Sequence, residues 1–314
     1  MVRCKLQFMF LVCLFLVNSV VVGKENYLPL KQALESPEKV KYIEVLCDSA
    51  SLDSLNKNIQ TLNHIAGIAF VGRPKDEKKI WNALNHLRML EQVFFIDNDL
   101  SKVEIGGSSS TIKKLWIKGS PDFDMGSLNS VLSKANYIQY LRIDSLHQTT
   151  FPYSIANLEL LKELQITNSN WKPRFVMSVA GNCKKLNKLI VSDNSFQFLS
   201  GEIKKIKHIK YLDLSGNAIS KLPKSIVKLS SLDTIVLNRN SFSSMEELGT
   251  RLKSMRLRHI IINGDTTVSR EEFEYRLPGA TIEWRKEKME HNFFVLPRNK
   301  GAIKKIEHFV DSIT

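Results

Sequence analysis

The seven histidines of this chain show no spacing that would bind a metal ion. No two of them form an H-E-x-x-H pair or another ligand spacing. The cluster Asp97-Asn98-Asp99 carries calcium-type ligands, but a calcium loop starting at Asp97 would need glycine at its sixth position and an acid at its twelfth. Lys102 and Ser108 stand at those positions. The sequence therefore predicts a turn here and no metal site.

Two further patterns that could indicate catalysis lack their required residues. The run Gly106-Gly107-Ser108-Ser109-Ser110 is rich in glycine, as phosphate-binding loops are, but no Gly-Lys-Ser/Thr follows it. We interpret it as a loop. No Gly-x-Ser-x-Gly sequence, the turn that presents a nucleophilic serine, occurs in the chain. We therefore expect no catalytic residues, no cofactor and no enzymatic activity.

With no metal-binding or catalytic motif, binding is the function that we expect. A sequence repeat would position the residues that bind. About ten segments place leucine or an equivalent at positions 1, 4 and 6, and they recur every 22 to 26 residues. The clearest copy starts at Ile209 and continues with Leu212, Leu214 and Asn217. Alternating apolar residues predict a short strand with one face turned inward, followed by apolar residues at a roughly helical spacing. Since no copy can bury its apolar face alone, the copies must stack.

This pattern resembles that of leucine-rich repeat proteins, specifically those with Leu-Pro at positions 14 and 15, and among them exported bacterial proteins. Leu222-Pro223 and Phe151-Pro152 carry that mark. The resemblance implies an α/β solenoid, with a curved parallel sheet on the concave face and 3₁₀ or short helices on the convex face. A terminal strand after Leu277 should direct Ala280 and Ile282 inward. The copies start at Val40, Ile65, Leu90, Ile112, Ile138, Leu161, Leu186, Ile209, Leu232 and Leu257.

Differences between the copies predict local structure. The position that favours asparagine holds it in four copies, at Asn98, Asn194, Asn217 and Asn240. A continuous asparagine ladder is therefore not expected in the first half of the chain. The insert 73–87 predicts a helix on the convex face, with Ile80, Leu84 and Leu87 on one side and Pro74 near its start. The later copies with Leu-Pro should have shorter 3₁₀ or irregular segments instead.

Side chains at positions 3, 5 and 7 of each copy should point onto the concave surface. We predict that a group of them in copies one to five binds a partner: Leu46, Val71, Phe94, Ile96, Trp116, Tyr140 and Arg142. Contiguous apolar residues mark interfaces, and Trp, Tyr and Arg are enriched at hot spots. We expect Phe94, Trp116 and Tyr140 to be solvent-accessible neighbours. Because the run 93–96 is apolar on both faces, a one-residue shift that turns these residues into core stays open.

The first 23 residues have the features of a secretory signal. Arg3 and Lys5 precede an apolar core, and small or β-branched residues lead to Gly23. Cleavage there would give a secreted or cell-envelope protein. An uncleaved membrane anchor is the alternative, although the apolar stretch 6–22 is short and interrupted.

The rest of the chain divides around the repeats. We expect an N-terminal cap at 24–39, the repeat domain at 40–284 and a basic tail or cap at 285–314. Cys47 and Cys183 remain after signal removal and lie five copies apart. Strands are spaced ~4.8 Å apart, so these cysteines should be too distant for a disulfide, which needs Cα atoms within ~7 Å.

The net charge is +13, and removal of Arg3 and Lys5 lowers it to +11. The basic residues are dispersed, as on an ordinary solvated surface, although an acidic glycan or another polyanion is a possible partner. No RRM, helix-turn-helix or finger motif supports nucleic-acid binding. We expect an exported, non-enzymatic scaffold that recognises a protein on its concave face. The alternatives are a membrane-anchored envelope scaffold, if the signal is retained, and a basic glycan- or polyanion-binding protein.

Overall fold

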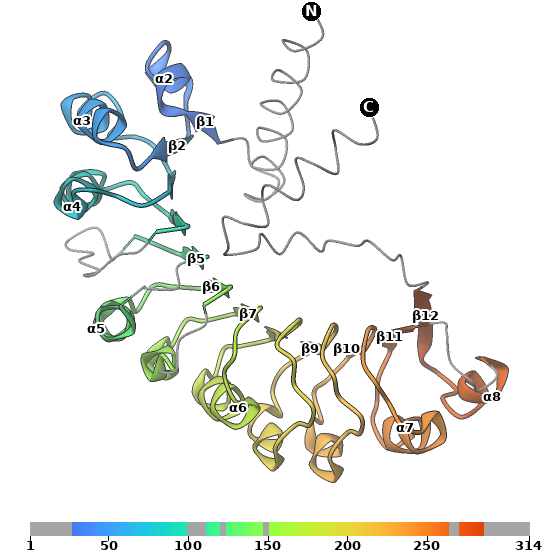
Figure 1. Ribbon diagram of the computed structural model, residues 1–314. Helices are drawn as coiled ribbons and strands as arrows, with labels where there is room; N and C mark the ends of the chain where they lie inside the picture. Colours follow the sequence, from blue (N-terminus) through green and yellow to red (C-terminus); the bar gives the residue numbers. More distant parts are fainter. Residues whose placement is uncertain (1–26, 99–110, 120–123, 147–150, 264–269, 286–314) are drawn as a thin grey trace, which may run out of the picture.

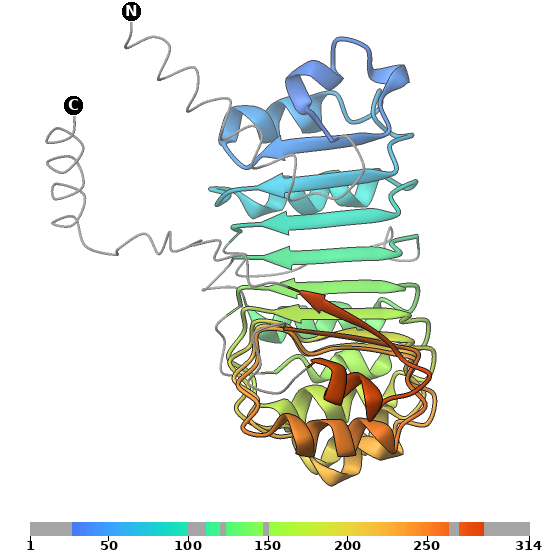
Figure 2. The ribbon, with the colours of Figure 1, turned by 90° about the vertical axis from the view of Figure 1, so that its right-hand side faces the viewer.

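The computed structural model describes residues 27–98, 111–119, 124–146, 151–263 and 270–285, and in these ranges the chain forms a curved solenoid. Twelve strands make one parallel sheet in which each strand pairs with its neighbours in sequence. The sheet lines the inner side of the curve and the helices lie outside it (Figures 1 and 2). The predicted α/β leucine-rich repeat solenoid is confirmed.

Every predicted copy supplies one strand, and one short strand precedes the first copy. The strands are β1 Leu28–Pro29, β2 Tyr42–Leu46, β3 Gly67–Val71, β4 Gln92–Ile96, β5 Lys114–Lys118, β6 Tyr140–Asp144, β7 Glu163–Thr167, β8 Lys188–Ile190, β9 Tyr211–Asp213, β10 Thr234–Val236, β11 His259–Asn263 and β12 Thr281–Arg285.

The convex elements alternate with the strands. They are α2 Leu30–Ala33, η1 Pro37–Lys39, α3 Ser49–Lys57, α4 Glu77–His86, α5 Met125–Lys134, η3 Tyr153–Asn157, α6 Pro173–Asn182, η4 Gly201–Ile206, η5 Lys224–Lys228, α7 Met245–Lys253 and α8 Arg270–Tyr275, where η marks a 3₁₀ helix.

The core lies between the sheet and the convex elements. In the clearest copy Leu212 and Leu214 point inward from the strand and are fully buried, and Ile226 meets them from η5. This alternation continues through the sheet, so that each strand buries one face against the next turn of chain. One continuous apolar core therefore runs from Leu30 to Leu277.

The convex elements follow the local sequence. Helix α4 forms in the insert as predicted, but it begins at Glu77 because Asp76 caps it by accepting a hydrogen bond from the Lys78 amide at 3.1 Å. Pro74 precedes the cap and does not start the helix. The two copies with a proline at position 15 form the 3₁₀ helices η3 and η5, as predicted.

Asparagine side chains join successive turns in the second half of the solenoid. Asn217 donates to the carbonyls of Val191 and Leu214 at 2.9 Å, and its oxygen accepts the amides of Asn194 and Phe196 at 3.1 and 3.0 Å. Asn194 and Asn240 make equivalent bonds in the copies on either side. In the first half Asn98 alone holds this position and reaches back to the Phe70 carbonyl.

The ends of the sheet differ from the middle. At the start, β1 pairs with β2, and Leu30 and Ala33 of α2 are buried behind it. At the other end the expected inward residues Ala280 and Ile282 do pack against the core, but the register differs by two residues, because Ile282 and Trp284 align with the inward Ile260 and Ile262. A slip of two keeps each side chain on the same face, so the strand was placed correctly and its register was not. The signal at 1–23, the glycine-serine run and most of the tail lie outside the described residues.

Candidate functional site

The sheet register places the predicted binding residues in rows across the concave face. Parallel pairing aligns Ala69 with Phe94, Phe94 with Trp116, and Trp116 with Arg142. A second row aligns Leu46, Val71 and Ile96. Residues in one row stand on adjacent strands ~4.8 Å apart, so their side chains meet. The concave surface of β2 to β6 therefore gathers six of the seven predicted residues into two neighbouring rows.

An apolar cluster forms there that is separate from the core. It contains Ala69, Phe94, Ile96 and Trp116, with Tyr27 and Val71 packed against it, and we call these six residues the concave cluster. Val93, Phe95, Leu115 and Ile117 of the same strands belong to the core instead. The strand phase was therefore correct, and the alternative of a one-residue shift is excluded.

The expected solvent access of this cluster was wrong for two of its three aromatic residues. Phe94 is 7% exposed and Trp116 is 5% exposed, whereas Tyr140 is 38% exposed. The rings of Phe94 and Trp116 pack edge to face with centroids 5.5 Å apart. Arg142 lies over the other side of Trp116, with its guanidinium carbon 4.1 Å from the ring centroid. Large aromatic side chains on adjacent strands cover one another, even on the outward face of a sheet.

Residues at the border of the concave cluster are more open. Leu46 is 53% exposed and stands next to Val71 in its row, at the edge of the cluster. Tyr140 occupies the row beside that of Trp116 and is also exposed. Leu46, Tyr140 and the half-buried Arg142 are therefore the accessible members of the predicted set.

Sequence reasoning missed Tyr27, which lies before the first copy and follows no repeat position. Its ring lies between Tyr42 and Phe94, with centroid distances of 5.3 and 5.5 Å. Its hydroxyl bonds to Gln92 Oε1 at 3.4 Å. Gly67 makes room for this ring, since a Cβ there would come within 2.7 Å of the Tyr27 hydroxyl oxygen. The only sequence signal was a glycine at a position where other copies carry larger side chains.

Polar groups border the concave cluster on its β6 side. Arg142 Nη2 lies 3.4 Å from Asp144 Oδ2, and Asp144 Oδ1 accepts from Ser145 and Asn168 at 3.1 Å. Burial lowers the pKa of Arg142, and the Asp144 carboxylate opposes that shift. Two buried donors, Trp116 Nε1 and Arg142 Nε, have no hydrogen-bond partner in the described structure. An unsatisfied buried N–H costs about 1–3 kcal/mol, so each of these two donors lowers the stability of the concave face as long as it lacks an acceptor.

The remaining concave surface carries mixed charge. Lys188 pairs with Glu163 at 3.1 Å and lies 5.4 Å from the ring centroid of Tyr211. Burial raises the pKa of Glu44, which stands beside Ala69 at the start of the sheet. Acids and bases are thus interspersed on the concave face of the described strands.

The described residues hold no group of three metal-ligating side chains. Cys47 and Cys183 are buried free thiols; Cys47 contacts Asn98, and Cys183 contacts the carbonyl of Ile155. Burial raises the pKa of both thiols to about 12. None of the described helices is long and apolar enough to cross a bilayer.

Comparisons with known proteins agree with the repeats. The leucine rich repeat family profile matches residues 184–242. The chain is 24% identical over 264 residues to the CD180 antigen of Mus musculus, an alignment that covers 74% of this chain. It spans only 36% of the length of that relative.

Two solved structures match this chain at low sequence identity. An internalin from Listeria monocytogenes is 16% identical, with 82% of this chain and 84% of the internalin covered and a TM-score of 0.43. A leucine-rich repeat protein from Leptospira interrogans is 15% identical, with 82% and 100% covered and a TM-score of 0.28. Both TM-scores are low, so the fold assignment rests on the repeats, the sheet and the family match.

Proposed function

Since the chain is a leucine-rich repeat protein, we propose that it is an exported, non-enzymatic scaffold that binds a protein on its concave face. Proteins of this family generally act as protein-binding scaffolds, because the curved sheet offers an extended surface. The proposed contact is centred on the concave cluster and includes Leu46, Tyr140 and Arg142 at its border.

The observation that carries this proposal is the pair of buried donors beside an aromatic surface. Trp116 Nε1 and Arg142 Nε have no acceptor in the described structure and stand on adjacent strands. A backbone carbonyl or a carboxylate of a partner would supply that acceptor once the Arg142 side chain turns away from the indole. Tyr140 and Leu46 would then pack against apolar side chains of the partner, as interface hot spots do.

The charge pattern favours a protein over a polyanion. Two concave cations of the described strands pair with acids: Lys188 with Glu163 and Arg142 with Asp144. A surface that binds a polyanion would instead present cations of one sign along its length. Export is supported by the sequence of residues 1–23, and retention of that segment would give a membrane-anchored form of the same scaffold.

A capture experiment with matched variants tests the proposal. The purified protein is immobilised and exposed to proteins of the native organism, in parallel with a variant carrying Leu46→Asp and Tyr140→Asp. Both side chains are exposed, so the variant should melt within a few degrees of the wild type. The matched control is Tyr275→Asp, which alters an exposed tyrosine on the convex helix α8.

We expect mass spectrometry to identify proteins that the wild type and the control retain and that the concave variant loses. Equal retention by all three would contradict a contact on the concave cluster. Retention that is abolished by salt yet unaffected by the two aspartates would support the polyanion alternative, because exposed charge interactions are screened by salt.

A further inference from the structure

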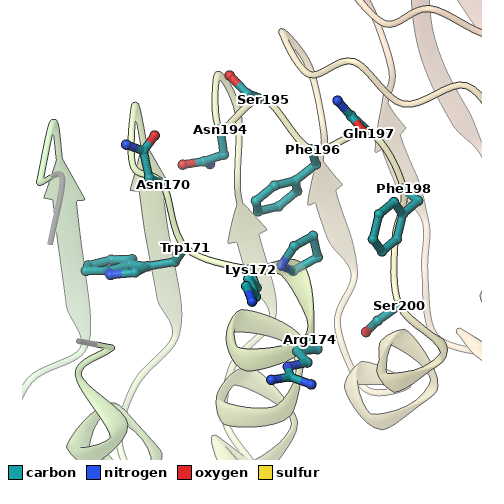
Figure 3. A pocket seen from close by; sticks show the side chains of 11 residues that line it. Asn170, Trp171, Lys172, Arg174, Asn194, Ser195, Phe196, Gln197, Phe198 and Ser200 are labelled. Carbon is teal, nitrogen blue, oxygen red and sulfur yellow. The ribbon is translucent and has the colours of Figure 1, made fainter. Parts of the chain in front are cut away.

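A hollow lies on the lateral edge of the solenoid, away from the concave cluster. It is formed where the chain leaves β7 for α6 and where it leaves β8 for η4 (Figure 3). Its volume is about 540 Å³. Small-molecule sites in proteins have volumes of roughly 300–1,000 Å³. The hollow is therefore large enough for a small organic ligand.

The apolar part of this lateral pocket is aromatic. Trp171, Phe196 and Phe198 line it, and Phe198 is 66% exposed although it is a large apolar side chain. Trp171 is 4% exposed and packs edge to face against Phe151, with centroids 5.0 Å apart. Its indole Nε1 has no hydrogen-bond partner in the described structure, but this atom is itself buried. The pocket thus has an aromatic wall, and the Phe198 ring in that wall is open to water.

The charged part of the lateral pocket is positive. Lys172 and Arg174 line it, and no carboxylate is among the lining residues. Both side chains are exposed, and within the described ranges neither forms a salt bridge. The guanidinium carbon of Arg174 lies 4.6 Å from the ring centroid of Phe175, which is not itself a lining residue.

The start of helix α6 adds to the positive electrostatic potential of the lateral pocket. Lys172 is its N-cap residue and makes no side-chain cap, and the first turn contains no acid. The N-terminus of a helix carries a partial positive charge that an acid or an anion usually neutralises. Two cations and an uncapped helix start thus border one apolar hollow.

From this combination we propose that the lateral pocket binds a small amphipathic organic anion, with an apolar body against Phe196 and Phe198 and an anionic head at Lys172 and Arg174. A neutral apolar molecule would leave the cations and the helix start without a counter-charge. An inorganic anion would leave the aromatic wall exposed. The site is independent of the concave cluster, so either proposal can fail without the other.

The probe is 1-anilinonaphthalene-8-sulfonate, which has an aryl body and one sulfonate and fluoresces when bound to an apolar site. The purified protein is titrated with it, and laurate and dodecanol are then compared as competitors. The test variant carries Lys172→Gln and Arg174→Gln. The control carries Lys253→Gln and Arg256→Gln, which remove the same charge from exposed positions outside the lateral pocket.

We expect saturable binding that the test variant weakens roughly tenfold or more, because two charge-assisted contacts are lost. The control should bind as the wild type does, laurate should displace the probe, and dodecanol should not. Equal binding by both variants would overturn the proposal, since the probe would then follow net charge alone. Displacement by dodecanol as effective as that by laurate would overturn anion recognition. Displacement by an acidic peptide but not by laurate would assign the pocket to a protein partner instead.

Discussion

At the scale of single residues, the buried side chain of Asn217 supplies hydrogen-bond partners to four backbone groups. Its side-chain amide donates to the carbonyls of Val191 and Leu214, and its oxygen accepts from the backbone amides of Asn194 and Phe196. We expect Asn217→Ala to lower the free energy of unfolding by roughly 2–4 kcal/mol, because these groups lose their partners inside the structure. The exposed Asn136→Ala should change it by about 0.5 kcal/mol or less. Urea denaturation measures both; similar values for the two variants would contradict the role of the ladder.

The two buried cysteines give a second prediction at this scale. Burial raises the pKa of Cys47 and Cys183 to about 12, so their thiolates are nearly absent in the folded protein at neutral pH. Since the thiolate is the reactive form, we expect slow labelling by a disulfide reagent at about pH 8 and full labelling after denaturation. Rapid labelling of the native protein would show that the thiols are accessible.

These shifts also predict the direction of a pH effect. The folded pKa of each thiol is raised above its unfolded value, so the stabilising contribution is complete below the unfolded pKa, ~8.5. It is lost as the pH rises from that value toward about 12. We expect Cys47→Ala/Cys183→Ala to show a smaller decrease in melting temperature between about pH 8 and pH 10 than the wild type does. An identical decrease would contradict the assignment.

The solvent exposure of single residues is what the sequence did not predict. Strand alternation placed Phe94 and Trp116 on the concave face correctly, because that depends only on position within a copy. Their burial depends on Tyr27 and Arg142, which come from outside the first copy and from the next strand. Exposure on a sheet is set by neighbouring strands and by the ends of the chain, and neither enters the pattern of one copy.

At the scale of elements, the repeat pattern predicts the type of a helix or strand better than its first residue or its register. The Leu-Pro mark was sufficient to predict η5, because proline fixes the backbone where the convex segment begins. Helix α4 begins after Asp76, because the Asp76 side chain caps it by accepting a hydrogen bond from the Lys78 amide. The sequence pattern had pointed to Pro74 instead. The predicted register of the terminal strand differs from the observed one by two residues. The pattern could not distinguish the two registers, because Ala280, Ile282 and Trp284 all lie on the same face of the strand.

Interchangeable elements lead to a prediction about deletion. Removal of residues 209–231 joins His208 to Leu232, which starts the next copy in the same phase. Asn240 would then take the place of Asn217 against β8, so the neighbour contacts re-form. We expect this variant to unfold cooperatively with only a modestly lower melting temperature.

The control for that deletion alters side chains and keeps the length. Leu212 and Leu214 are fully buried, and Leu212→Asp/Leu214→Asp places two carboxylates in the core without partners. Each costs several kcal/mol, so this variant should not fold. Thermal unfolding followed by circular dichroism compares the two. If the deletion also abolishes folding, the copies are not interchangeable.

At the scale of the whole molecule, the proposed export leads to a prediction of where the mature protein begins. Residues 1–23 combine a basic start with a short apolar core, and Gly23 precedes Lys24. We expect the mature protein to start near Lys24, with Tyr27 retained to complete the concave cluster. N-terminal sequencing of exported material measures this. Recovery of residues 1–23 would instead support the anchored form.

The asparagine ladder has a mechanical consequence for the whole molecule. Asn194, Asn217 and Asn240 cross-link consecutive turns of the second half, while the first half, which contains the concave cluster, has Asn98 alone at this position. The two halves of the solenoid are therefore held together in different ways. Side chains join the turns of the second half, where β8 to β10 are only three residues long, whereas β2 to β7 are five residues long each. Loss of one ladder asparagine would therefore loosen the turns around β8 to β10, where the backbone pairing between strands is shortest.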